Sequence, residues 1–132
     1  MTKIKYIAVS CAALMTLAAC QTTQENLAES GATKLDKSAV TSVFSGNTVP
    51  WSSGEGSSFH AADGNYMYKS NAGSTGSGTW RVSDAGDYCF IVKDWYDTEQ
   101  CFEIYKKDDQ LISVAGDGTR RTMKEGAAGN TL

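Results

Sequence analysis

The sequence has one histidine, one proline and fewer basic than acidic residues, 12 against 15, in a chain of 132. A single histidine, His60, leaves a metal site short of nitrogen ligands, because such sites gather several cysteines and histidines. The acidic balance disfavours nucleic acid as a partner, since phosphate binding requires clustered lysine and arginine. One proline beside 13 glycines is typical of an all-β chain with many tight turns.

The chain also lacks an apolar run long enough to cross a membrane, which takes roughly 20 residues. Its first 19 residues carry Lys3 and Lys5, then a short apolar stretch and small residues, the pattern of a secretory signal peptide. The stretch Leu17-Ala18-Ala19-Cys20 resembles the lipobox of bacterial lipoproteins. This resemblance implies cleavage before Cys20, lipid on its thiol and acylation, for example with palmitate, of the new amino terminus. Several acyl chains give the stable anchoring that one chain does not.

The residue after Cys20 predicts where such a lipoprotein is attached. In the family an aspartate there tends to retain the protein at the inner membrane, and this chain has Gln21. We therefore expect a lipid anchor in the outer membrane, on the periplasmic face. Since Lys3 and Lys5 leave with the signal, 10 basic residues remain against 15 acidic ones, a net charge of −5.

Two segments follow the anchor. Residues 20–34 are polar, with no apolar periodicity beyond Leu27, and predict a flexible tether. Residues 35–46 place apolar side chains on one face of a short helix, with Asp36 as its N-cap and Gly46 at its C-terminal end. We expect this helix to close one end of a sheet, and a partner-binding helix is the alternative.

The rest of the chain alternates short extended runs with turn signals such as Asp63-Gly64 and Asp117-Gly118. Strands this close in sequence leave no room for crossover helices, so they should pair antiparallel and in order. The prediction is an all-β domain over residues 35–125, a meander of about eight short strands forming a barrel or half-barrel. Residues 126–132 are expected to be a frayed tail. The eight predicted strands are 48–52, 57–62, 65–70, 78–83, 88–93, 100–106, 110–115 and 119–124.

Cys89 and Cys101 lie in two consecutive predicted strands, 88–93 and 100–106, which a short loop connects. If they face each other across a hairpin, Tyr88 lies opposite Phe102, and alternation puts one apolar set on the core face and the cysteines on the other. An even pair in an exported protein is most simply a structural disulfide. A metal site and a redox couple are the alternatives, and the chain offers neither extra ligands nor Cys-X-X-Cys spacing. The predicted core-face residues are Tyr88, Phe90, Val92, Phe102 and Ile104.

The hairpin tip carries two aromatic residues, Trp95 and Tyr96, which form the candidate contact surface. The alternative is that Trp95 folds back over the open end of the sheet. Calcium binding by the three acids of the tip, Asp94, Asp97 and Glu99, is disfavoured because their spacing lacks the glycine of a calcium loop. No catalytic residue is predicted, since His60 has no evident nucleophile or orienting acid in the sequence. Arg120-Arg121 is expected to be a strand-edge charge pair.

The stretches Gly46-Asn47-Thr48-Val49 and Gly78-Thr79-Trp80, followed by Cys89 and then Cys101 with Tyr105, resemble a family of small exported bacterial β proteins with a two-cysteine hairpin. The resemblance covers about residues 37–118, and its motifs are mainly structural. The family has no known function. The resemblance therefore implies a fold and a compartment but no activity.

Together these observations predict a non-enzymatic lipoprotein without a cofactor, acting as a binding or envelope-structural module. Its partners would be the membrane, through Cys20, and an envelope protein. The alternative is a calycin-like carrier of a small apolar ligand. In that carrier the pocket would be lined by Trp80, Tyr88, Phe90 and Phe102.

Overall fold

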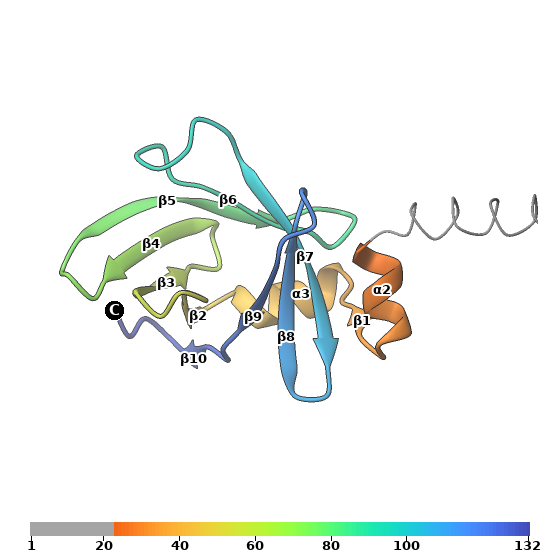
Figure 1. Cartoon of the computed structure of the whole chain (residues 1–132). Coiled ribbons are helices and arrows are strands. Elements are labelled where there is room, and N and C mark those ends of the chain that lie inside the picture. The colour runs from red at the N-terminus through yellow and green to blue at the C-terminus, as the bar shows by residue number, and fades with distance from the viewer. Residues whose placement is uncertain (1–22) are drawn as a thin grey trace, which may run out of the picture.

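A computed structural model describes residues 23–132 of the chain (Figure 1). In this part, ten strands form one antiparallel sheet that curls into a half-barrel, with two short helices, α2 (Thr23–Glu29) and α3 (Lys37–Phe44). The predicted all-β meander is confirmed. Neither helix of the described residues is long and apolar enough to span a membrane. The predicted signal peptide and the lipid-bearing Cys20 lie outside the described residues.

The eight predicted strands are all present, with modest shifts at their ends. Each strand from β2 to β8 pairs antiparallel with the next one in sequence, as short turns between extended runs require. Their bounds are β2 (Asn47–Pro50), β3 (Gly56–His60), β4 (Asn65–Ser70), β5 (Thr75–Val82), β6 (Tyr88–Ile91), β7 (Gln100–Lys107), β8 (Gln110–Ala115) and β9 (Arg120–Met123).

Helix α3 forms where the sequence predicts it and closes one end of the half-barrel. The Asp36 carboxylate caps it by accepting a hydrogen bond from the Ala39 amide at 2.8 Å. The chain then turns through Gly46, whose φ of +75° lies in the region that favours glycine. Val40 and Phe44 are buried in the interior of the sheet.

The opposite end of the half-barrel is open. Because the strands alternate in direction, β2, β4, β6 and β8 all end on the same side, whereas α3 enters β2 from the other side. The loops that follow these four strands therefore gather around one mouth. They comprise residues 51–55, 71–74, 92–99 and 116–119.

The segment predicted as a flexible tether is ordered in its described part, which corrects that prediction. Helix α2 is followed by β1 (Thr33–Lys34), which pairs with β7. Leu27 and Ala32 are buried in a second apolar cluster with Tyr105 and Val114, on the outer face of the sheet. Sequence periodicity missed this contact because it rests on two apolar residues that dock on a face formed by distant strands.

The predicted frayed tail is wrong as well. β10 (Ala127–Ala128) pairs with β2, and Gly129 donates a backbone hydrogen bond to Gly46 at 2.8 Å. The Thr48 hydroxyl donates to the Gly129 carbonyl at 2.7 Å and accepts from the Thr131 amide at 3.0 Å. Small residues fit here because a Cβ at Gly126 would lie 2.8 Å from the Thr48 carbonyl. The tail therefore extends the sheet beyond its first long strand.

Candidate binding site

The open end of the half-barrel leads into a pocket of about 550 Å³. Its walls come from the concave face of the sheet, the Phe44 ring of α3 and three of the four mouth loops. Most of the lining surface is aromatic or aliphatic, with serine, histidine and tyrosine groups among it. The lining residues include Trp51, Ser58, His60, Tyr66, Tyr88, Phe90, Trp95, Tyr96, Phe102 and Arg121.

Trp51, Trp95 and Tyr96 form the aromatic rim of this mouth. Trp95 packs edge-on against Trp51, with ring centroids 5.5 Å apart, and lies 4.3 Å from the Tyr68 ring. Both residues of the predicted contact surface stay accessible, Trp95 at 38% and Tyr96 at 43%. In residues 23–132 they are the large hydrophobic side chains classed as exposed. Trp95 thus folds toward the sheet end, as the alternative expected, and still presents a ring to solvent.

The floor of the pocket carries a chain of hydrogen bonds across β3 and β4. The Trp51 indole Nε1–H donates to Ser58 Oγ at 2.6 Å, and Ser58 Oγ hydrogen-bonds the Tyr66 hydroxyl. Ser58 and Tyr66 are buried, at 2% and 3% exposure. Burial raises the pKa of Tyr66 to about 12, although the neighbouring polar groups of Ser58 and Trp51 pull it down in part. The phenol is therefore neutral at physiological pH.

His60 lies deeper, surrounded by the rings of Phe44, Tyr66, Trp80 and Tyr88. Its Nε2 hydrogen-bonds the Tyr88 hydroxyl at 2.6 Å, and its Nδ1 has no partner of acceptable geometry in the described part of the chain. Burial lowers the pKa of His60 to about 4, partly opposed by the backbone of Asn47 and Ser58, so the ring is neutral. These contacts are those of a buried core residue.

The hairpin register matches the prediction. Cys89 lies opposite Cys101 and Tyr88 opposite Phe102, and the two sulfurs form a disulfide. The predicted core face is also correct: Tyr88, Val92 and Ile104 are buried, and Phe90 and Phe102 pack against them. The bridge joins β6 and β7 at the base of the loop that carries Trp95 and Tyr96.

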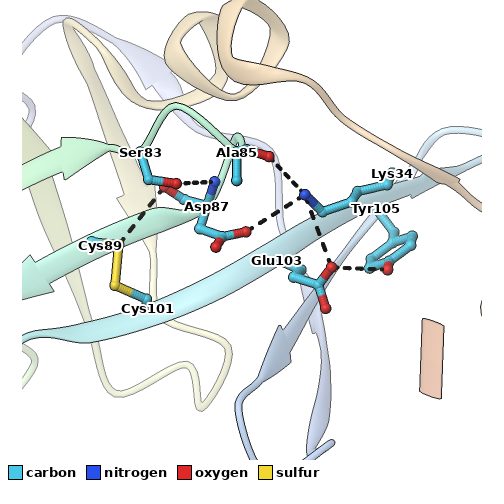
Figure 2. Close-up of polar contacts among 8 residues, drawn as sticks. All are labelled: Lys34, Ser83, Ala85, Asp87, Cys89, Cys101, Glu103 and Tyr105. Carbon is cyan, nitrogen blue, oxygen red and sulfur yellow. Dashed lines mark hydrogen bonds and ion pairs between the residues drawn. A yellow bond between two sulfur atoms is a disulfide. The ribbon is translucent and has the colours of Figure 1, made fainter. Parts of the chain in front are cut away.

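Figure 2 shows how the ordered N-terminal segment is held beside this disulfide. The Lys34 ammonium donates to the Ala85 carbonyl at 2.8 Å and lies 3.6 Å from Asp87 and 3.9 Å from Glu103. Tyr105, next to Glu103, is fully buried, and burial together with this carboxylate raises its pKa to about 12. The cluster ties β1 to the outer face, away from the pocket.

Two of the charged residues considered for metal or anion binding, Glu99 and Arg121, can be placed relative to the pocket and the disulfide. Glu99 pairs with Arg81 of β5 through contacts of 2.6 and 2.9 Å, which lower the pKa of the Glu99 carboxyl. In the described residues the one group with metal-ligand spacing joins Glu99 to Cys89 and Cys101. Those sulfurs are bonded to each other, so they offer no thiolate. Of the pair Arg120-Arg121, Arg121 lies on the pocket wall and is exposed.

Sequence reasoning missed the polar floor and misplaced one wall residue. Ser58 and His60 point inward from β3 while Phe59 points outward, so the inward face of this strand is polar and its apolar alternation is weak. Trp51, which lies after β2, gave no periodic signal. Trp80, predicted to line the pocket, is not among its lining residues and donates its indole N–H to the Ala61 carbonyl at 2.8 Å.

Comparison with known families places residues 11–112 in the family described as "Protein of unknown function (DUF995)". This match agrees with the predicted resemblance to a family without a known function. No curated protein and no solved structure matches the chain significantly.

Proposed function

Since the chain belongs to the DUF995 family, whose function is unknown, we propose its role from its own residues: it is a lipid-anchored envelope protein whose half-barrel binds a small, mainly apolar molecule. The observation that carries this proposal is the pocket of about 550 Å³, which combines aromatic walls with a few buried polar groups. This combination is typical of small-molecule sites, where apolar surface supplies affinity and polar groups supply orientation. The proposed role is binding, without an enzymatic reaction.

The anchor is the second part of the proposal. Cys20 precedes the first residue of α2 by three positions, and α2 packs on the outer face of the sheet. In Figure 1, α2 lies at the right, whereas the loop after β6 and the turn after β4 lie toward the left. A lipid at Cys20 in the outer membrane would therefore hold the back of the domain near the bilayer and leave the pocket mouth facing the periplasm.

The binding function is tested by native mass spectrometry of the protein extracted from its own envelope. A co-purifying molecule at near-stoichiometric amount, reduced in Trp95→Ala, supports the pocket. A protein that carries no such molecule under gentle extraction contradicts the carrier function.

The anchor is tested by metabolic labelling with an alkyne analogue of palmitate. Cys20→Ser should lose the label and leave the membrane fraction, since it removes the proposed acceptor thiol. Cys11→Ser is the matched control and should keep the label, because Cys11 leaves with the signal. Equal labelling of both variants would refute lipid attachment at Cys20.

A second candidate, an envelope-structural contact, is favoured by the exposure of Trp95 and Tyr96. A photo-crosslinking residue in place of Tyr96 should then capture one envelope protein. The same residue in place of Asp109, in the turn at the opposite end, should not. Equal crosslinking at both positions would argue against a specific contact at the tip.

A further inference from the structure

The chain of hydrogen bonds on the pocket floor has one more polar hydrogen than it has hydrogen bonds. The Trp51 indole only donates, and Ser58 Oγ receives that bond. Ser58 and Tyr66 share the next bond, so three polar hydrogens meet two hydrogen bonds. In the described part of the chain no further acceptor contacts either hydroxyl. One hydroxyl hydrogen therefore faces whatever occupies the pocket.

The direction of the chain identifies that hydrogen. Ser58 Oγ accepts from the indole, and donating onward to the Tyr66 oxygen makes each bond strengthen the next. In the reverse order Ser58 Oγ would accept from both Trp51 and Tyr66, and neither bond would strengthen the other through the Ser58 hydroxyl. The unused donor is thus the Tyr66 O–H, which can swing about its C–O bond toward the cavity. Because its pKa is about 12, this group remains a donor at any physiological pH.

The surroundings of Tyr66 select against a negatively charged ligand group. His60, whose ring packs edge-on against Tyr66, is neutral in its buried setting. Among the described lining residues the cationic side chain is Arg121, which is exposed on the wall formed by β9. A carboxylate placed on the floor would lose its hydration without gaining a counter-charge. A neutral oxygen would lose much less hydration free energy on entering the pocket.

We propose that the molecule bound in this pocket ends in an uncharged carbonyl oxygen, which accepts a hydrogen bond from the Tyr66 hydroxyl while its apolar body lies against Phe90, Phe102 and Trp95. This inference rests on the proposed function and defines the chemical class of the ligand: an amphipathic ketone, ester or amide. The rings of Phe90 and Phe102 are stacked 6.0 Å apart along one wall and provide the apolar surface.

The test compares two probes of the same shape, 2-acetylnaphthalene and 2-isopropenylnaphthalene, which differ only in a carbonyl oxygen and a methylene group. The protein is the mature chain, residues 20–132, with Cys20→Ser to prevent lipid attachment and with ¹⁵N labelling. The indole N–H resonances of Trp51 and Trp95 report binding at the mouth and floor. Trp80, whose indole donates to Ala61 outside the pocket lining, is the internal reference.

We expect the ketone to bind about 5-fold more tightly than the alkene, the effect of one added neutral hydrogen bond. 2-Naphthoate, which replaces the methyl group by a charged oxygen, should bind more weakly than the ketone. Tyr66→Phe should abolish the preference for the ketone. Tyr68→Phe, the same change two residues along the same face of β4, should preserve it.

Three results would overturn the inference while leaving pocket binding intact: equal affinity for ketone and alkene, a preference that survives Tyr66→Phe, or naphthoate binding as tightly as the ketone. If no probe shifts the resonances of Trp51 or Trp95, the proposed binding function itself fails. An unchanged Trp80 resonance in each variant shows that the fold is retained.

Discussion

Opening the Cys89–Cys101 disulfide should lower the free energy of unfolding by about 3 kcal/mol, the entropy that a closed loop of this size removes from the unfolded chain. The two cysteines are 12 residues apart in sequence. The bridge matters for β6 in particular, since only two other residue pairs, Tyr88 with Phe102 and Phe90 with Gln100, join this short strand to β7. The loop that carries Trp95 and Tyr96 begins at this junction.

The measurement is urea unfolding of the wild-type protein in oxidised and reduced form, followed by tryptophan fluorescence. Reduction opens the disulfide without removing heavy atoms of the side chains. The difference in unfolding free energy between the two forms therefore measures the effect of closing the loop. Thermal unfolding of the same two forms should show a melting temperature about 10 °C lower for the reduced form, as expected for a domain of this size. The slope of the free energy against urea should rise, because the open chain exposes more surface. The variant Cys89→Ala/Cys101→Ala then gives the packing contribution of the buried Cys89. Equal midpoints and slopes for both redox forms would refute the reasoning.

Three further predictions test the core, a close backbone approach and the N-terminal segment. Lowering the pH from 7 to 5 should reduce the free energy of unfolding by about 2 kcal/mol. Burial holds the pKa of His60 at about 4 in the folded protein, against 6.5 in the unfolded chain, so over this range the unfolded chain binds a proton that the folded protein does not. Urea unfolding of wild type and His60→Gln at both pH values checks this, and an equal loss in the variant would contradict it. Gly78→Ala should lower the free energy of unfolding by about 2 kcal/mol, because the added Cβ would clash with the Ile91 carbonyl. Gly116→Ala is the control: its Cβ would meet nothing within 4 Å, so thermal unfolding should show a change of at most about 0.5 kcal/mol. Leu27→Ala should speed amide hydrogen exchange in α2 and β1 and leave exchange in β3–β5 unchanged, because Leu27 belongs to the apolar cluster on the outer face of the sheet. An equal increase of exchange in all these elements would contradict the independence of this cluster from the main core.

The strands and α3 could be predicted because their signals are local. Asp-Gly turns, a side-chain period of two and a capping aspartate act over a few residues, so a single sequence reveals them. The hairpin register could also be predicted, since placing Cys89 opposite Cys101 puts Tyr88 and Phe90 on one apolar face, as observed. The cysteines and the period of two give the same register.

The pocket floor could not be predicted in the same way. Trp51 follows one strand, Ser58 lies in the next and Tyr66 in a third, and their hydrogen bonds exist only because β2, β3 and β4 align. The sequence alone predicts that Ser58 is exposed, because the inward-facing positions of a strand are expected to be apolar. Its burial is tolerated because both its neighbours supply hydrogen-bonding groups.

By itself, the sequence determined the class of this protein: an antiparallel meander with one capping helix and a cysteine hairpin of known register. Those features follow from interactions between near neighbours or from a covalent pair. Only the tertiary structure decided that the meander leaves one end open, that α2 and β1 cover its outer face, and that Trp51, Ser58 and Tyr66 meet on a polar floor. These depend on the curl of the whole sheet, which brings residues from separate strands together and is set by packing rather than by any local pattern.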